Sequence, residues 1–458
     1  MKTTPNFLNL HSHDFVRIAV ATPLVQVADP AFNADQTIAL LKEAVERNAL
    51  VTIFPELGLS AWSCDDLLQQ QVLFDACQTA LKLVLAASCD LPSIVVLGLP
   101  LQIGDLLFNC ATILYRGNIL GVVPKTYLPN YREFYEGRQF APRDFALKDD
   151  IELCGQSSIP FGNRLLFEID EQPLLRFYVE ISEDLWVPIP PSSVVALAGA
   201  TLLINLSASN ATIGKADYRR QLVCGQSARC LAAYAYSAAG SGESTTDLAW
   251  DGHGMIYENG TALAETHRFL DTAQLITADV DLDRLSAERM RQTSVGQSAQ
   301  RHRDQCTAFR TIRVDAAIDR KSHLPLQRSY DRFPYVPSDP ATLDARCREA
   351  CEIQVQGLVT RMRAAGVEKL VIGVSGGLDS AQALLVCVAA MEMMHRPCSH
   401  VIACMLPGFA TSERTASLAR QLIGTLGCQV NEIDIRPACM QMLKDIDHPF
   451  PGGKRSTM

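Results

Sequence analysis

One eight-residue stretch, Gly373–Ser380, has the residue types and spacing most directly suited to chemistry; it reads Gly-Val-Ser-Gly-Gly-Leu-Asp-Ser. The apolar run 369–374 is typical of a buried parallel strand, and residues 381–394 have the character of a helix. Where a strand meets a helix amino end, free backbone N–H groups and the helix dipole attract phosphate. The stretch therefore predicts a pyrophosphate-binding loop.

The loop lacks the lysine of the Gly-x-x-x-x-Gly-Lys-Ser/Thr motif. It resembles instead the Ser-Gly-Gly-x-Asp-Ser loop of the ATP pyrophosphatases, which cleave ATP between the α and β phosphates and adenylylate a substrate. A glycine-rich turn without a ligand is the alternative. Asp379 would repel phosphate unless it held Mg²⁺ or a loop amide. The resemblance implies that ATP or pyrophosphate is bound by Gly373, Val374, Ser375, Gly376, Gly377, Leu378, Asp379 and Ser380.

Three polar residues, Glu56, Lys125 and Ser182, each follow a short apolar run with strand character. The carboxyl end of a strand is the usual place for chemistry in α/β proteins. Each residue also has an ordinary interpretation when it is taken singly: Glu56 and Ser182 as helix caps, and Lys125 as a solvated surface lysine.

The sequences that flank these residues resemble the three catalytic blocks of the nitrilase superfamily, in the same order. In that family a cysteine attacks an amide or nitrile carbon, a glutamate relays protons and a lysine stabilises the oxyanion. The resemblance implies Glu56 as base, Lys125 as electrophilic partner and Ser182 at the nucleophile position. The blocks are Phe54–Leu57, Pro124–Glu136 and Val179–Trp186.

Position 182 holds serine where the nitrilase pattern has cysteine. A free thiol has a pKa of about 8.5 and is partly ionised near neutrality, whereas an alcohol needs a dedicated, aligned base. We therefore expect amide hydrolysis to be severely impaired. An engineered replacement and a natural loss explain the serine equally well.

The nitrilase-like blocks followed by the pyrophosphate loop resemble the glutamine-dependent NAD synthetases, from about Phe15 to about Pro449. The resemblance implies that Tyr131, Ser209 and Lys215 hold glutamine, although Ser209 and Lys215 alone also fit a loop that caps a helix. It further implies that Glu136 supports Lys125. The stretches that carry this closer likeness are Tyr131–Glu136, Asn205–Ser209 and Gly242–Gly252.

This family resemblance implies that glutamine supplies ammonia, which replaces AMP on adenylylated deamido-NAD to give NAD. ATP is then a cosubstrate, Mg²⁺ accompanies it, and the protein is a homo-oligomer. The likeness fades after Phe450, so we expect the family's later segments to be missing. Two alternatives are a catalytically dead scaffold or regulatory homologue, and an amidotransferase for another adenylylated acceptor.

Composition fits a globular protein: of 458 residues, 48% are hydrophobic and 20% charged. The net charge of -9 argues against nucleic acid as a partner. Fifteen cysteines without a Cys-x-x-Cys pair, and an amino terminus without an apolar signal core, indicate a reducing cytoplasm. The uncharged stretch Ser380–Met391 is too short to span a bilayer. The nine histidines show no metal-ligand spacing, so a metal site stays unassigned.

The elements that must position these residues alternate between strand and helix from Val16 onward, which predicts an α/β fold. With the resemblance, we expect a nitrilase-like α-β-β-α sandwich as a glutaminase domain over 14–281. An arginine-containing solvated linker over 282–337 follows. A partial NAD synthetase ATP-binding domain over 338–458 would then form a doubly wound parallel sheet of the adenine nucleotide hydrolase type. Strands are expected at Val16–Ala21, Leu50–Phe54, Ile94–Gly98, Cys110–Tyr115, Ile119–Val123, Leu174–Ile181, Thr201–Leu206 and Ala232–Ala238.

Overall fold

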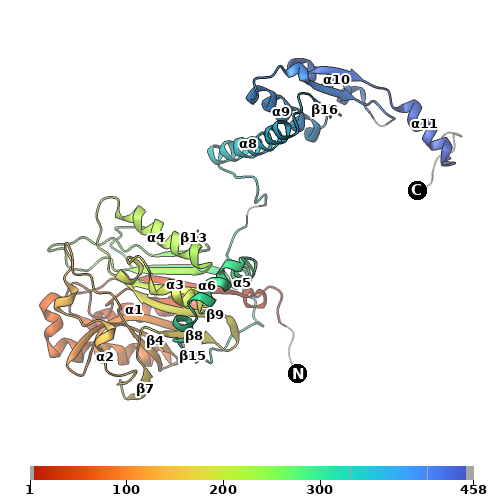
Figure 1. The fold of residues 1–458 in the computed structure, drawn as a ribbon. Helices are drawn as coiled ribbons and strands as arrows, with labels where there is room; N and C mark the ends of the chain where they lie inside the picture. The colour runs from red at the N-terminus through yellow and green to blue at the C-terminus, as the bar shows by residue number, and fades with distance from the viewer. Residues whose placement is uncertain (1–4, 331, 410, 450–458) are drawn as a thin grey trace. The chain divides into compact units, whose positions relative to one another are not determined.

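The computed structural model describes residues 5–330, 332–409 and 411–449 (Figure 1). The sequence predictions about the first four residues and about the tail from Phe450 lie outside these ranges. The chain forms two compact units, Met1–Ser329 and Tyr330–Met458.

The first unit contains two large sheets. The six-stranded sheet has the order β14 (Gln274–Asp281), β1 (Phe15–Thr22), β2 (Val51–Ile53), β3 (Ile94–Ile103), β4 (Leu106–Tyr115) and β5 (Asn118–Pro124). The seven-stranded sheet has the order β13 (Thr261–Glu265), β12 (Met255–Glu258), β11 (Ala233–Ala238), β10 (Leu202–Ser207), β9 (Gln172–Ile181), β8 (Leu165–Ile169) and β15 (Arg310–Val314). A separate hairpin pairs β6 (Asp150–Leu153) with β7 (Gln156–Pro160).

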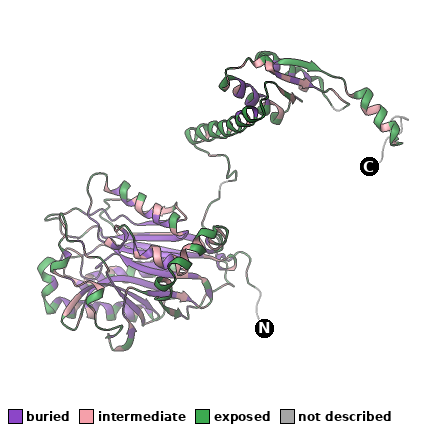
Figure 2. Ribbon diagram, viewed as in Figure 1, coloured by how far each residue is buried: buried purple, intermediate pink, exposed green. Residues whose placement is uncertain are grey.

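Alternate residues of a strand point to opposite faces of its sheet. One face packs against the other sheet and the opposite face packs against helices, so the unit is a four-layer sandwich. Ile18 and Val20 of β1 join Phe177 of β9 in the core between the sheets. Ala19 and Ala21 of β1 face the opposite way and pack in the layer formed by helices α1 (Pro30–Glu46) and α2 (Gln71–Ser88). Helices α3 (Pro191–Leu197) and α4 (Lys215–Cys230) cover the other sheet. Strands buried on both faces explain the continuous apolar runs, visible as buried ribbons in Figure 2. The predicted α-β-β-α sandwich is confirmed.

Short 3-10 helices occur in the segments outside the strands of the first unit. They are η1 (Leu10–His13), η2 (Asp65–Gln69), η3 (Glu136–Arg138), η4 (Arg143–Phe145) and η5 (Ser182–Leu185).

The stretch predicted as a linker, 282–337, differs from that expectation over most of its length. It contains α5 (Leu282–Arg291), α6 (Thr293–Arg301), α7 (Arg303–Thr307) and strand β15, and the first unit continues to Ser329. Arg289 is not solvated: its guanidinium donates to the carbonyls of Leu231 at 2.9 Å and Cys230 at 3.0 Å. Burial lowers its pKa to about 10. Strand β15 was not predicted because its sequence is rich in charged residues. It is an edge strand, and an edge strand needs few buried side chains.

The second unit follows the predicted β-α-β-α-β order, with a parallel sheet in the order β16-β17-β18. Residues from α9 and α10 share one cluster with Val401 and Ala403 of β17, so both helices lie on the same face of the described strands. The elements are α8 (Pro340–Ala365), β16 (Leu370–Gly373), α9 (Leu378–Met393), η6 (Cys398–His400), β17 (Val401–Met405), α10 (Glu413–Thr425), β18 (Gln429–Glu432) and α11 (Arg436–Asp445).

Helix α8 is capped by Asp339, whose side chain accepts a hydrogen bond from the Thr342 amide at 2.8 Å. Its buried residues, Val355, Val359 and Met362, lie toward the carboxyl end. Cys347, nearer the start of the helix, is exposed. No helix within the described ranges has the length and apolar character needed to cross a membrane.

Candidate active site

The three polar residues singled out in the sequence lie at strand ends of the first unit. Lys125 comes directly after β5 and Glu56 shortly after β2, both in the six-stranded sheet. The Lys125 amide donates to the Asn109 carbonyl at 2.8 Å, which continues the pairing of β5 with β4 and fixes the lysine backbone. Ser182 is the first residue after β9 of the facing sheet.

Lys125 is a buried cation held between two carboxylates. Its Nζ donates to Glu56 Oε1 at 2.7 Å and to Glu136 Oε1 and Oε2 at 2.8 and 2.7 Å. The three residues are only 1%, 1% and 6% exposed in the order Lys125, Glu56, Glu136. The Asn109 side-chain amide donates a further bond to Glu56 Oε1 at 2.7 Å. The predicted support of Lys125 by Glu136 therefore has a geometric basis.

The two carboxylates hold the charge of Lys125 in place against its burial. Burial alone lowers the pKa of Lys125, but Glu136 and Glu56 raise it beyond its ordinary value, so the lysine remains an ammonium ion. Burial raises the pKa of Glu136, and the lysine charge opposes that rise. Glu56 Oε2 accepts no hydrogen bond from the described residues. One carboxylate oxygen next to a fixed cation is thus free to take a proton.

Ser182 has a backbone φ of 43°, in the left-handed region that non-glycine residues seldom adopt. Such strain persists where the surrounding structure enforces it, and it often marks functional sites. The Ser182 Oγ lies 3.3 Å from the Oγ of Ser207, the last residue of neighbouring β10.

Asp184, which the sequence analysis missed, ties the Ser182 turn to the segment after Lys125. Its Oδ2 accepts from the Ile181 amide at 3.1 Å, and its Oδ1 accepts from the Tyr127 amide at 2.8 Å. Burial and the nearby Glu180 raise its pKa to about 7. An acidic residue two places after the candidate nucleophile, at the start of a helical turn, was the available signal.

In the second unit the candidate phosphate loop joins β16 to α9, as predicted. The hydroxyls of Ser375 and Ser380 lie 3.1 Å apart, and Ser380 Oγ also accepts from the Ser375 amide at 3.1 Å. Gly376 has φ of 83°, and a Cβ there would lie 2.2 Å from the Thr415 carbonyl oxygen. The loop conformation therefore requires glycine at 376.

A cavity of about 560 Å³ lies over this loop, lined by Gly373, Ser375 and Gly377 and by residues that follow β17, including Thr411. It lies at the carboxyl ends of parallel strands, where α/β sheets bind ligands. Over the described ranges no three His, Cys, Asp or Glu side chains gather as metal ligands. Asp379 is the one carboxylate of the loop.

Comparison with known proteins assigns both units. The carbon–nitrogen hydrolase family matches residues 17–290, and the NAD synthase family matches residues 350–450. The chain belongs to the carbon–nitrogen hydrolase family. With the NAD synthase region following in the same chain, it has the domain order of the glutamine-dependent NAD synthetases, a family of ligases.

The relatives support this assignment along nearly the whole chain. A glutamine-dependent NAD(+) synthetase of Mycobacterium tuberculosis is 46% identical over 451 residues, which cover 98% of this chain and 66% of that protein. The synthetase of Thermotoga maritima is 26% identical, with 95% and 68% covered. The chain thus spans about two thirds of the length of these relatives. A solved glutamine-dependent NAD(+) synthetase from Cytophaga hutchinsonii shares the fold, with a TM-score of 0.52, 19% identity, and 95% and 68% covered.

Two of the three residues predicted to hold glutamine, Tyr131 and Lys215, lie near the ring of Phe134. The rings of Tyr131 and Phe134 lie 6.3 Å apart, and Lys215 Nζ lies 5.3 Å from the Phe134 ring centroid. Burial lowers the pKa of Lys215 to about 8. Ser209 is buried. The Tyr131 hydroxyl donates to Glu183 Oε1 at 2.9 Å, which connects Tyr131 to the residue that follows Ser182 in the chain.

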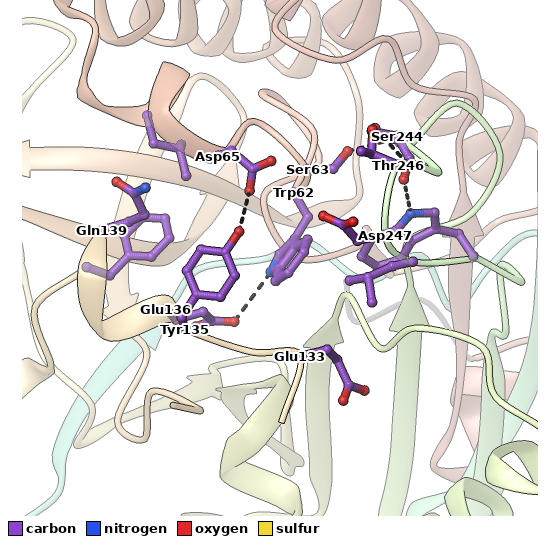
Figure 3. A pocket seen from close by; sticks show the side chains of 14 residues that line it. Trp62, Ser63, Asp65, Glu133, Tyr135, Glu136, Gln139, Ser244, Thr246 and Asp247 are labelled. Atoms are coloured by element: carbon purple, nitrogen blue, oxygen red, sulfur yellow. Dashed lines mark hydrogen bonds between the residues drawn. The ribbon is translucent and has the colours of Figure 1, made fainter. Parts of the chain in front are cut away.

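A pocket of about 70 Å³ adjoins the trio of Lys125, Glu56 and Glu136 (Figure 3). Trp62 and Glu136 both line it, and the Trp62 indole donates to Glu136 Oε1 at 3.4 Å. Glu243 fixes the Trp62 segment, since it accepts from the Trp62 amide at 2.8 Å and the Ser63 amide at 2.9 Å. Sequence reasoning gave Trp62 and Glu243 no role, because their contact joins segments about 180 residues apart.

Proposed function

We propose that this chain is a glutamine-dependent NAD synthetase, in which the first unit releases ammonia from glutamine and the second unit uses ATP to amidate deamido-NAD. The observation that carries the first half is the buried Lys125 ammonium held by Glu56 and Glu136, on the opposite sheet from Ser182 and linked to it through Asp184. Glutamine would be held by Tyr131, Ser209 and Lys215.

The arrangement suits nucleophilic attack on an amide. The side chain at position 182 would bond to the amide carbon while Glu56 takes its proton, and Lys125 would stabilise the oxyanion. The C–N bond then breaks as Glu56 returns the proton to the leaving nitrogen, which departs as ammonia. Water, deprotonated by Glu56, hydrolyses the ester or thioester and yields glutamate with the side chain restored.

The hydroxyl at position 182 should make this step slow. Glu56 and Lys125 can assist a nucleophile, but an alcohol at neutral pH has almost no ionised fraction, whereas a thiol has a substantial one. The serine therefore predicts a site that binds glutamine well and turns it over poorly.

The second unit would use ATP as cosubstrate. The carboxylate of deamido-NAD would attack the α phosphate, pyrophosphate would leave into the loop of Gly373–Ser380, and ammonia would displace AMP. Mg²⁺ would enter with the phosphates, and Asp379 is the loop carboxylate able to contact it. We place the protein in the cytoplasm, a proposal that the fifteen free cysteines of the described ranges support. The homo-oligomeric state is proposed from the resemblance to the synthetase family alone.

The decisive experiment restores the thiol. The Ser182→Cys protein should release ammonia from glutamine at least about 10²-fold faster than the parent, because an ionisable nucleophile then meets an intact Glu56 and Lys125. A Ser182→Ala protein is the matched control and should stay inactive. A folded Ser182→Cys protein that binds glutamine and still releases no ammonia would contradict the proposal. Incubation with labelled deamido-NAD, ATP and ammonia tests the identity of the acceptor. Formation of labelled NAD would support deamido-NAD, and its absence would favour another adenylylated acceptor.

The serine also favours a second candidate, a subunit that binds glutamine without hydrolysing it. The Ser182→Cys protein separates the two, because a glutamine-binding subunit should bind glutamine in titration calorimetry and still release no ammonia once the thiol is present. Co-elution with an intact synthetase would support the scaffold role.

A further inference from the structure

Three hydroxyl groups lie side by side where parallel strands β9, β10 and β11 end. The pairing of Leu206 with Ile181 places Ser207, the next residue of β10, alongside Ser182. On the other side of β10, Asn205 pairs with Tyr236 of β11. The parallel register therefore brings these hydroxyls to the same end of the seven-stranded sheet, beside the candidate nucleophile.

The hydrogen bonds among these groups have a direction. The Tyr236 hydroxyl donates to Ser207 Oγ at 2.8 Å, and Ser207 Oγ lies 3.3 Å from Ser182 Oγ. Tyr236 and Ser207 are fully buried. Burial raises the pKa of Tyr236, so the phenol keeps its single hydrogen and uses it on Ser207. The hydrogen of Ser207 then has Ser182 as its partner among the described residues.

We propose that Ser207 and Tyr236 are positioning residues for the nucleophile: the chain Tyr236 to Ser207 to position 182 directs an O–H donor at the attacking atom and stabilises it as an anion. The role of this hydroxyl chain in catalysis rests on the proposed glutamine hydrolysis, whereas the hydrogen bond to position 182 can be tested without it. Because Ser207 donates, the hydrogen of Ser182 is left free for an acceptor elsewhere in the site.

The separation of 3.3 Å also bears on which nucleophile the site suits. It exceeds the usual O–H···O distance of about 2.5 to 3.0 Å, so the serine hydroxyl receives a weak bond. A sulfur atom has a larger radius and a longer bond to Cβ, and it accepts hydrogen bonds at longer distances. The same donor should therefore act more strongly on a thiolate.

Several charged groups act on Tyr236 or on the residues that follow position 182, and the substitutions below leave all of them intact. Arg219 of α4 is paired with Asp251 at 2.9 Å and lowers the pKa of Tyr236, opposing burial. Changes caused by losing the Ser207 hydroxyl can thus be separated from changes in charge. Glu183 and Asp184 follow position 182 in the chain, and the charged groups that act on them or on Tyr236 are Glu56, Lys125, Glu180, Lys215, Arg219 and Asp251.

The test measures thiol ionisation in the Ser182→Cys protein. The alkylation rate at position 182 is followed against pH, with mass spectrometry of the peptide that contains it, so that the other cysteines do not interfere. Adding Ser207→Ala should move the midpoint upward by about one pH unit, a tenfold fall in thiolate at a given pH, because a hydrogen bond to the charged form is lost. Tyr236→Phe should shift it upward by less, since Ser207 keeps its hydrogen but loses its orientation.

Two controls make the result specific. Ser237→Ala removes another buried β11 hydroxyl, which donates to the Ala21 carbonyl at 2.8 Å, and should leave the midpoint unchanged. Ser207→Thr keeps the hydroxyl and should restore the midpoint. An unshifted midpoint in Ser207→Ala, or in Tyr236→Phe if the first protein does not fold, would overturn the inference. A shifted midpoint in a protein that releases no ammonia would support the hydrogen bond while contradicting the proposed function.

Discussion

The two candidate sites use opposite means of holding charge. In the first unit the site consists of ionised side chains, Lys125, Glu56 and Glu136, which are almost completely buried. In the second unit it consists of backbone amides and exposed serine hydroxyls, shaped by a glycine in the left-handed region. A buried ion needs its partners at all times, whereas a loop of amides needs only its conformation. The two sites should therefore fail in different ways when they are changed.

The largest effect is expected where a buried charge loses its partner. Lys125→Met in the Ser182→Cys protein leaves two carboxylates facing each other without a cation, so the free energy of unfolding should fall by about 3 to 5 kcal/mol. Ammonia release should also be lost, because no group remains to stabilise the oxyanion. Denaturant unfolding and an ammonia assay measure the two effects.

Glu56→Gln in the same background separates chemistry from stability. It removes the proton acceptor but keeps a group that can accept a bond from Lys125, so activity should fall by about 10² to 10⁴-fold with a smaller loss of stability. Glu43→Gln, at an exposed carboxylate of α1, is the control and should change neither quantity. Equal activity in Glu56→Gln and its parent would show that the trio only supports the fold.

A smaller effect is expected in the second unit, where conformation matters and charge does not. Gly376→Ala places a Cβ against the Thr415 carbonyl oxygen in a backbone region unfavourable to alanine, at a cost of about 1 to 3 kcal/mol. ATP with Mg²⁺ should protect the amides of 373–381 from hydrogen exchange in the parent but not in this variant.

Gly357→Ala, in α8 and outside the loop, is the matched control, since a Cβ at 357 meets nothing within 4 Å. In this variant the amides of 373–381 should be protected as in the parent. Nucleotide protection that survives Gly376→Ala would show that the loop conformation does not decide binding. Neither variant should alter ammonia release in the Ser182→Cys background, because the first unit carries its own trio.

The sequence allowed more to be predicted for the loop than for the buried site. The conformation of a local motif such as Gly373–Ser380 depends mainly on its own residues. The bounds of the strand, loop and helix were therefore predicted to within a few residues. Lys125 and Glu56 could be named from their flanking blocks, but Asp184 and Glu243 act through contacts between distant segments, which no local pattern reveals. The linker prediction failed for a related reason, since β15 pairs with β8 about 145 residues earlier.

The smallest effect is expected at Asp184. This residue belongs to the buried site, but like the phosphate loop it acts through hydrogen bonds with backbone amides. Its pKa is raised from 3.8 to about 7 by burial and Glu180, so the folded protein binds a proton there that the unfolded chain releases above about pH 4. A raised carboxyl pKa means that stability contributed by this group falls as pH rises from about 4 to 7.

Asp184→Asn removes this titration but keeps one acceptor oxygen for the Ile181 or Tyr127 amide. Its stability should therefore depend less steeply on pH across that window, with a constant loss of about 1 to 2 kcal/mol from the missing bond. Denaturant unfolding at several pH values measures the slope. Glu180→Gln is the comparison, since burial also raises the pKa of Glu180 to about 7 while its carboxylate contacts Tyr234 and Ser192, away from the Lys125 segment. If both variants flatten the slope but only Asp184→Asn slows ammonia release in the Ser182→Cys background, Asp184 positions the nucleophile turn. If neither slows it, the carboxylate serves the fold alone.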